Sequence, residues 1–252
     1  MKNAKQIEIM AHLVAGYPDT GASLRLAETF AASGANILEI QMPFSEPVAD
    51  GPTIVEACHV ALKNGFRSKE IFAFCHKVSK FGVPIVIMSY SNPIMSIGID
   101  SFCRQAVAAG VSGLIVPDLP FDSKEGEELL ACSKKYGLNL IQVVSPSMSG
   151  DRLKRSIACS QGMIYCTTKR GTTGGQTSIS ADLKKVIEAI RKQSDIKIAL
   201  GFGISSRKDV EAVAGLADIA VVGSALLRAF SSGGGEDAAA KLLKSMKPPL
   251  DR

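Results

Sequence analysis

Short apolar runs alternate with longer amphipathic segments along the whole chain, and this alternation is the feature that most limits its fold. The runs are rich in Ile, Val and Leu, and polar and apolar residues do not alternate within them. This composition is typical of strands that are covered on both faces of a parallel sheet. The runs predict eight parallel strands, at residues 9–15, 36–41, 84–90, 113–118, 139–145, 163–168, 196–201 and 218–223.

Helical patterns fill the intervals between the apolar runs. Apolar residues recur there at spacings of three and four in the segments 23–33, 101–110, 125–137, 182–193 and 208–216. A further helix is expected to start near Pro52, and a last one follows the SSGGG turn in the tail. Repeated strand-then-helix units favour a (β/α)8 TIM barrel, in the α/β class, over an open doubly wound sheet.

The residues that follow the first predicted strand argue against a doubly wound sheet. That strand leads into VAGYPDT, which lacks the G-x-G-x-x-G turn of a dinucleotide-binding sheet. No linker divides the sequence into two parts. We therefore expect a single TIM-barrel domain over residues 1–252.

Composition and charge exclude several classes of protein. The chain has 46% hydrophobic and 21% charged residues, as in ordinary globular proteins, and no apolar stretch long enough for a membrane span or a signal peptide, so we expect it to be cytoplasmic. Its net charge of +5 comes with no cluster of basic and aromatic residues, which argues against a nucleic-acid partner. Six cysteines without a C-x-x-C pair and three scattered histidines predict free thiols and no metal site.

Two glycine-containing turns follow the last two predicted strands. Gly201 and Gly203 lie in ALGFGISS, and Gly223 and Ser224 lie in VVGSALL. Glycine lets the backbone approach a ligand, and barrels often bind phosphate at the loops after their seventh and eighth strands. We therefore predict a phosphate site here. The loop after the sixth strand, TKRGTTGGQTS, is either a surface connection or a lid that closes over substrate.

Two carboxylates stand near the second strand. Glu39 interrupts the apolar run and should point into the barrel or toward its mouth, where it either transfers protons or is bonded to a basic neighbour as a structural residue. Asp50 lies in ADGP just beyond, where a turn or helix-capping role is the alternative to a catalytic one. The residues alone leave both choices open.

The segment LEIQMPFSEPVADGPTI resembles the one that marks the α subunit of tryptophan synthase. The similarity continues in register through AGYPD, YSNPI, VPDLP, the TTGG segment, GFGIS and GSA, and so covers essentially the whole barrel. The resemblance implies a carbon–carbon lyase that cleaves indole-3-glycerol phosphate to indole and glyceraldehyde 3-phosphate in L-tryptophan biosynthesis. A sugar-phosphate isomerase barrel does not explain the PFSxPxADGP pattern.

Matching motif to motif, the resemblance implies a role for each site residue. Glu39 is the principal acid and base, and Asp50 is the second catalytic carboxylate, which stabilises the ring nitrogen. Thr173 ties the closed lid to Asp50. The other implied substrate contacts are Tyr165 and Phe202 beside the indole, Tyr90 lower in the pocket, and Gly174, Gly203, Gly223 and Ser224 at the phosphate.

The resemblance also implies a partner. The α subunit pairs with a tryptophan synthase β subunit in an α2β2 heterotetramer, and indole passes between the subunits through an enclosed channel. Pyridoxal phosphate is expected in the β subunit, and no cofactor is expected in this chain.

Four residues depart from the family pattern. Gln41 stands where glycine is usual, Glu46 replaces an aspartate, and Lys169 and Arg170 alter the lid. Gln41 is expected to crowd the cavity mouth beside Glu39, and Arg170 to hinder closure of the lid. These departures leave an alternative to the active lyase: a lyase-impaired α subunit that serves mainly as an allosteric activator of the β subunit.

Overall fold

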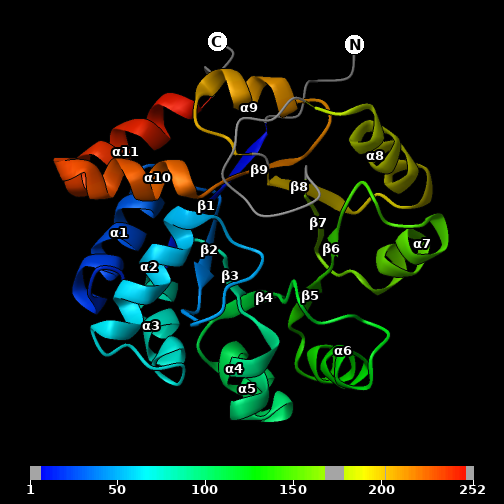
Figure 1. Cartoon of the computed structure of the whole chain (residues 1–252), viewed down its shortest axis with the longest axis horizontal. Helices are drawn as coiled ribbons and strands as arrows, with labels where there is room; N and C mark the ends of the chain where they lie inside the picture. Colours follow the sequence, from blue (N-terminus) through cyan, green and yellow to red (C-terminus); the bar gives the residue numbers. More distant parts are fainter. Residues whose placement is uncertain (1–6, 168–178, 202, 248–252) are drawn as a thin grey trace.

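Parallel strands form a ring at the centre of the molecule (Figure 1). In this computed structural model the described residues are 7–167, 179–201 and 203–247. The strands within these ranges are β1 (Glu8–Val14), β2 (Ile37–Gln41), β3 (Ile85–Met88), β4 (Val111–Ile115), β5 (Asn139–Ile141), β6 (Val143–Val144), β7 (Met163–Thr167), β8 (Lys197–Gly201) and β9 (Ile219–Val222).

The sheet closes on itself through one divided strand. Its order is β5-β4-β3-β2-β1-β9-β8-β7-β6, and β5 and β6 are consecutive pieces of the run predicted as one strand at 139–145. β5 pairs with β4 and β6 pairs with β7, so the two edges of the sheet meet at Gln142. The predicted TIM barrel is confirmed, and its eight predicted strands are all present.

Helices surround the ring of strands, as Figure 1 shows. Those predicted from the 3.6-residue pattern are confirmed, with ends that differ by a few residues. The helices are α1 (Thr20–Ala32), α2 (Pro52–Lys63), α3 (Glu70–Val78), α4 (Ser91–Ile97), α5 (Ile99–Ala108), α6 (Lys124–Tyr136), α7 (Gly150–Cys159), α8 (Ala181–Gln193), α9 (Arg207–Val213), α10 (Ser224–Ala229) and α11 (Gly235–Met246), with short η1 (Ser79–Phe81) and η2 (Phe230–Gly234).

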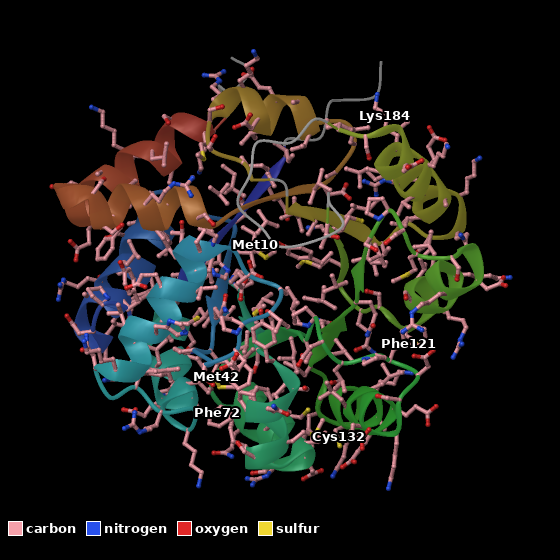
Figure 2. The ribbon with its side chains drawn as sticks, in the orientation of Figure 1. Met10, Met42, Phe72, Phe121, Cys132 and Lys184 are labelled. Atoms are coloured by element: carbon pink, nitrogen blue, oxygen red, sulfur yellow. The ribbon has the colours of Figure 1, made fainter. Side chains whose placement is uncertain are left out.

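Two apolar clusters explain why the strands are hydrophobic on both faces. One fills the inside of the ring and includes Met10, Val86 and Ile219. The other lies between the strands and the helices and includes Phe30 and Phe72. Figure 2 shows Met10 near the centre of the ring and Phe72 among the outer helices. Burial of one such side chain stabilises the fold by about 1.5–3 kcal/mol.

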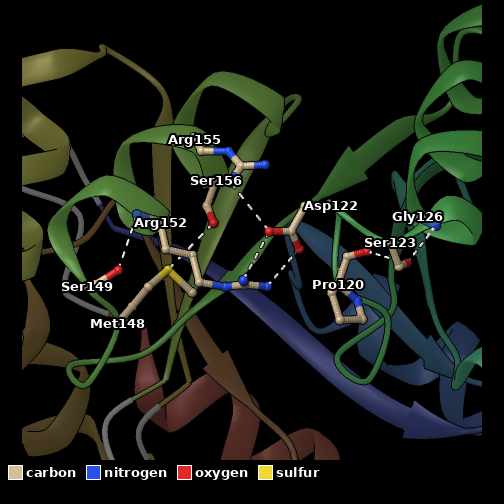
Figure 3. A network of polar contacts seen from close by, with 9 residues as sticks. All are labelled: Pro120, Asp122, Ser123, Gly126, Met148, Ser149, Arg152, Arg155 and Ser156. Atoms are coloured by element: carbon tan, nitrogen blue, oxygen red, sulfur yellow. Dashed lines mark hydrogen bonds and ion pairs between the residues drawn. The ribbon is translucent and has the colours of Figure 1, made fainter.

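Polar contacts join α7 to the loop that precedes α6, on either side of the divided strand (Figure 3). Arg152 in α7 donates two hydrogen bonds of 3.1 Å to Asp122, which precedes α6. Arg155 also approaches Asp122, at 3.5 Å, and both guanidinium groups lie over the ring of Phe121. The arginines are partly exposed, so these contacts are worth at most about 1 kcal/mol each, but they connect α7 to the loop that leads into α6 across the seam.

Candidate active site

A cavity of about 330 Å³ opens at the carboxyl ends of the strands. Its polar lining includes Glu39, Asp50 and His12, and its apolar lining includes Met88 and Ile115. In a parallel barrel this is the end at which the strand-to-helix loops converge, and it is where active sites are found. The cavity therefore brings the two predicted carboxylates to one site.

Glu39 reaches the cavity from the middle of β2. It has only 3% of its surface exposed, and its Oε2 atom lies 3.1 Å from Nδ1 of His12. The two residues are register partners on the adjacent parallel strands β1 and β2, so their side chains leave the sheet side by side. The basic neighbour of the structural alternative is thus present, but Glu39 also faces the cavity and keeps access to a ligand.

His12 is held between Glu39 and the turn after β9. A Cβ atom built on Gly223 would lie 3.3 Å from Cβ of His12, so glycine at that position leaves room for the imidazole. Burial lowers the pKa of His12, but the charge and hydrogen bond of Glu39, with smaller contributions from Asp50 and Gln41, act in the opposite direction, and the net pKa is raised. The Nε2 atom is buried and has no hydrogen-bond partner among the described residues.

Asp50 turns its side chain into the barrel from the loop between β2 and α2. Its exposed fraction is 9%, and its Oδ2 atom accepts hydrogen bonds of 2.7 Å from the Tyr90 hydroxyl and from Nε2 of Gln41. Burial raises the pKa of Asp50, although both hydrogen bonds and the nearby His12 act in the opposite direction. The helix-capping alternative is wrong, because the residue that caps α2 is Gly51.

Gln41 supports Asp50 and does not crowd the mouth of the cavity. It points to the same side of β2 as Glu39, is completely buried, and is absent from the cavity wall. In addition to its bond to Asp50, its Nε2 atom lies 3.4 Å from Sγ of Cys58. Its Oε1 atom has no partner within the described part of the chain. The expected steric obstruction was therefore wrong.

Tyr90 lies behind Asp50. Its hydroxyl donates to Asp50 and accepts a hydrogen bond of 3.0 Å from the backbone N–H of Ala49, while its ring packs on Phe44 with centroids 5.4 Å apart. The side chain is fully buried and is not part of the cavity wall. Burial raises the pKa of its hydroxyl, which therefore remains a donor over the ordinary pH range.

Tyr165 lies on the cavity wall, in the middle of β7. A side chain on Gly201 of the neighbouring strand β8 would collide with the Tyr165 ring, so glycine there lets the ring lie across the strand end. Burial raises the pKa of Tyr165, and the charges of Glu39 and Asp50 act in the same direction. The tyrosine provides a neutral aromatic surface next to the two carboxylates.

The predicted phosphate turns also face the cavity. Gly203, Gly223 and Ser224 line it, and Gly203 has φ of +61°, a backbone conformation that favours glycine. Thr173, Gly174 and Phe202 lie outside the described residues, as do Lys169 and Arg170 of the expected lid.

Two residues of the site were missed as functional candidates. His12 is not among the site residues predicted from the sequence, although strand parity places it on the same side of β1 as buried Met10. Arg228 of α10 lines the cavity and donates a long hydrogen bond of 3.4 Å to Oγ1 of Thr53. Its position one turn beyond the predicted phosphate turn was the available signal.

Other predicted properties concern cysteines, metals and membranes. All six cysteines are free, as expected. The described residues contain no group of three or more His, Cys, Asp or Glu side chains arranged to hold a metal ion. Among the helices that the structure describes, none is long and apolar enough to cross a membrane.

Comparisons with known proteins agree on one family. The family model described as tryptophan synthase alpha chain matches residues 1–248. The tryptophan synthase alpha chain of Syntrophotalea carbinolica is 38% identical over 231 residues, which are 91% of this chain and 90% of the relative. That of Aquifex aeolicus is 37% identical over an alignment of 253 positions, which covers 99% of this chain and 95% of the relative.

Solved structures give the same result. The structure of Mycobacterium tuberculosis tryptophan synthase superimposes with a TM-score of 0.90 and 34% identity, covering 96% of this chain and 92% of the other. A mutant tryptophan synthase alpha-subunit from Pyrococcus furiosus superimposes with a TM-score of 0.86 and 30% identity, covering 96% of this chain and 98% of the other.

Proposed function

The chain belongs to the tryptophan synthase alpha chain family, whose reaction is the carbon–carbon lyase cleavage of indole-3-glycerol phosphate, and we propose that Glu39 and Asp50 carry out that reaction here. The products are indole and glyceraldehyde 3-phosphate. The observation that carries the assignment is that both carboxylates face one cavity whose wall also contains the glycine turns after β8 and β9.

Glu39 moves two protons in the proposed mechanism. Its carboxyl group first gives a proton to C3 of the indole ring, which places positive charge on the ring nitrogen. The resulting carboxylate then takes the proton of the adjacent side-chain hydroxyl. The carbon–carbon bond breaks as the aldehyde forms, its electrons return to the ring, and Glu39 again carries one proton.

Asp50 stabilises the positive charge that develops on the ring nitrogen. Its carboxylate is fixed in advance by the hydroxyl of Tyr90 and the amide of Gln41, so little reorganisation is needed when the charge appears. We propose that Tyr90 acts through Asp50, since its side chain is absent from the cavity wall. This role replaces the direct substrate contact that the family resemblance implied.

Binding is divided between an apolar and a polar part of the cavity. Tyr165, with Met88 and Ile115, provides the surface for the indole ring. Gly203, Gly223 and Ser224 would hold the phosphate through backbone groups. From the family resemblance, we propose that Phe202 assists at the indole, Gly174 at the phosphate, and Thr173 at Asp50 when substrate is bound.

The proposed partner is a tryptophan synthase β subunit in an α2β2 heterotetramer, with the present chain contributing one barrel domain. Val48 supports a contact near Asp50, because 69% of this apolar residue is exposed in the same loop. Pyridoxal phosphate would be held by the β subunit. The condensation of indole with serine would take place in that subunit and not in the present chain.

Release of glyceraldehyde 3-phosphate from indole-3-glycerol phosphate tests the proposal. Glu39→Gln should reduce the rate by at least about a hundredfold, in the range lost when a general acid–base group is removed. Glu8→Gln is the matched control, because Glu8 is also a strand glutamate but pairs with Lys197 at the opposite end of the barrel. Unchanged turnover in Glu39→Gln would refute the assignment.

The same purified chain separates the active lyase from the lyase-impaired alternative. Normal release of glyceraldehyde 3-phosphate in the presence of the β subunit excludes the impaired form. Absence of release, together with faster condensation of indole and serine by the β subunit, supports it. Gln41, one of the residues that suggested impairment, lies beneath Asp50 as a hydrogen-bond donor.

A further inference from the structure

We propose that His12 is a further catalytic residue, which hydrogen-bonds a hydroxyl of the glycerol chain through Nε2 while it holds Glu39 through Nδ1. The inference rests on the proposed function of Glu39. It arises from an interaction that no sequence motif indicates, namely the pairing of His12 with Glu39 across two adjacent strands.

The position of the imidazole is fixed on two sides. Its Nδ1 atom lies 3.1 Å from Oε2 of Glu39, and its carbon atoms pack beside Gly223. Only 7% of the residue is exposed, so the ring has little freedom to turn elsewhere. The Nδ1 atom is therefore committed to Glu39, and Nε2 is the remaining polar atom of the ring.

Nε2 is one of two buried side-chain polar atoms without a partner in the described part of the chain. The residue lines the cavity, so a ligand bound there can supply the missing hydrogen bond. Buried polar groups in native proteins are almost always paired, and an unpaired one costs free energy. A hydroxyl suits this atom, because it can accept a hydrogen bond from the Nε2–H group while its own proton remains available to Glu39.

The order of groups in the cavity selects the part of the substrate that reaches His12. Glu39 acts at the bond between the ring and the glycerol chain, and the turn at Gly223 is the proposed phosphate site. His12 lies between these two places and contacts both. The segment of substrate that joins the reacting carbon to the phosphate is the hydroxyl-bearing glycerol chain.

The proposed contact requires no proton to leave His12. The imidazole aligns the hydroxyl toward the Glu39 carboxylate, which accepts the proton as described above. It also keeps that carboxylate in one orientation through Nδ1. His12 thus contacts both the substrate hydroxyl that loses a proton and the Glu39 carboxylate that receives it.

Three substitutions separate the functions of the two ring nitrogens. His12→Asn keeps an amide donor near the Nδ1 position, His12→Gln keeps one near the Nε2 position, and His12→Phe keeps neither. The measurements are kcat/KM for indole-3-glycerol phosphate and the Kd of indole-3-propanol phosphate, an analogue that lacks both hydroxyls. Glu39→Gln is assayed in parallel.

We expect His12→Phe to lower kcat/KM at least roughly tenfold, the effect of losing a hydrogen bond to a buried polar group. The Kd of the analogue should change less than about twofold, because it has no hydroxyl for His12 to contact. His12→Gln should recover part of the loss and His12→Asn should recover less. Binding of the analogue shows that each variant is folded.

Two results would overturn the inference. If His12→Asn restores full activity and His12→Gln does not, His12 acts only by positioning Glu39. If His12→Phe raises the Kd of the analogue by the same factor by which it lowers kcat/KM for the substrate, His12 contributes to packing and does not contact the hydroxyl. Full activity in Glu39→Gln would instead refute the proposed function itself, whatever the His12 variants do.

Discussion

Replacement of Gln41 by leucine tests how the barrel supports Asp50. Leucine has a similar volume and no polar atoms, so Gln41→Leu removes the 2.7 Å hydrogen bond to Asp50 and also the unpaired Oε1 atom. A hydrogen bond to a charged group contributes about 1.5–3 kcal/mol, and an unpaired buried polar atom costs about 1–3 kcal/mol. The two effects oppose each other in the folded protein, so we expect the free energy of unfolding to change by less than about 1.5 kcal/mol.

Catalysis should respond more strongly than stability. The lost bond of about 1.5–3 kcal/mol corresponds to a factor of roughly 10 to 150 if all of it is used in the transition state. Tyr90 remains bonded to Asp50, so we expect a decrease of kcat/KM near the lower end of that range. The pKa of Asp50, already raised by burial, should rise further without the amide. Because the ionised carboxylate is the active form, the acid limb of the pH profile should move to higher pH.

The measurements are release of glyceraldehyde 3-phosphate between acidic and neutral pH, and unfolding in denaturant. Gln142→Leu is the matched control, since Gln142 is also a buried barrel glutamine but lines a different cavity, beside Phe121. The reasoning is refuted if Gln41→Leu retains wild-type kcat/KM and an unmoved acid limb.

Two further predictions concern Asp50 and the lid. In Asp50→Asn one amide oxygen can accept the bonds from both Tyr90 and Gln41, so the fold should be retained and lyase turnover lost. The pKa of Asp50 is raised in the folded protein, so the stabilisation that comes from its protonated form is present at low pH and is lost as the pH rises. At neutral pH, where the wild-type protein buries a charged carboxylate, Asp50→Asn should therefore have a free energy of unfolding at least equal to that of wild type. A lower free energy of unfolding in denaturant would contradict the raised pKa of Asp50. Arg170→Ser should raise lyase turnover in a steady-state assay, because arginine stands where the family has a small residue; an unchanged rate would count against the explanation of the lid.

The barrel was predictable because its strands are covered on both faces. The interior and exterior apolar clusters leave no polar face on most strands, and this gives uninterrupted Ile, Val and Leu runs in the sequence. The division of the fifth strand at Gln142 was not predicted, because the apolar pattern continues across it. It depends on which neighbour each half pairs with, and pairing is a property of the closed ring.

Site residues that stand in one local sequence motif could be predicted. Those that meet only through the register of two strands could not. Glu39 and Asp50 stand in one continuous segment, whereas His12 meets Glu39 only through the register of β1 with β2. Gln41 is an intermediate case. Its spacing of two from Glu39 places both side chains on one side of the strand, so its inward direction followed from the sequence, but its bond to Asp50 depended on how the loop returns.

The different supports of the two carboxylates account for their different roles. Asp50 is held by a hydroxyl and an amide that donate and do not change charge at ordinary pH, so both stabilise its ionised form against the effect of burial. Glu39 is held by an imidazole, which can gain or lose a proton near neutral pH. A carboxylate with fixed neutral donors is suited to remain charged beside the ring nitrogen. One that faces a titratable partner is suited to carry a proton in one step and give it up in the next, which is what the cleavage requires of Glu39.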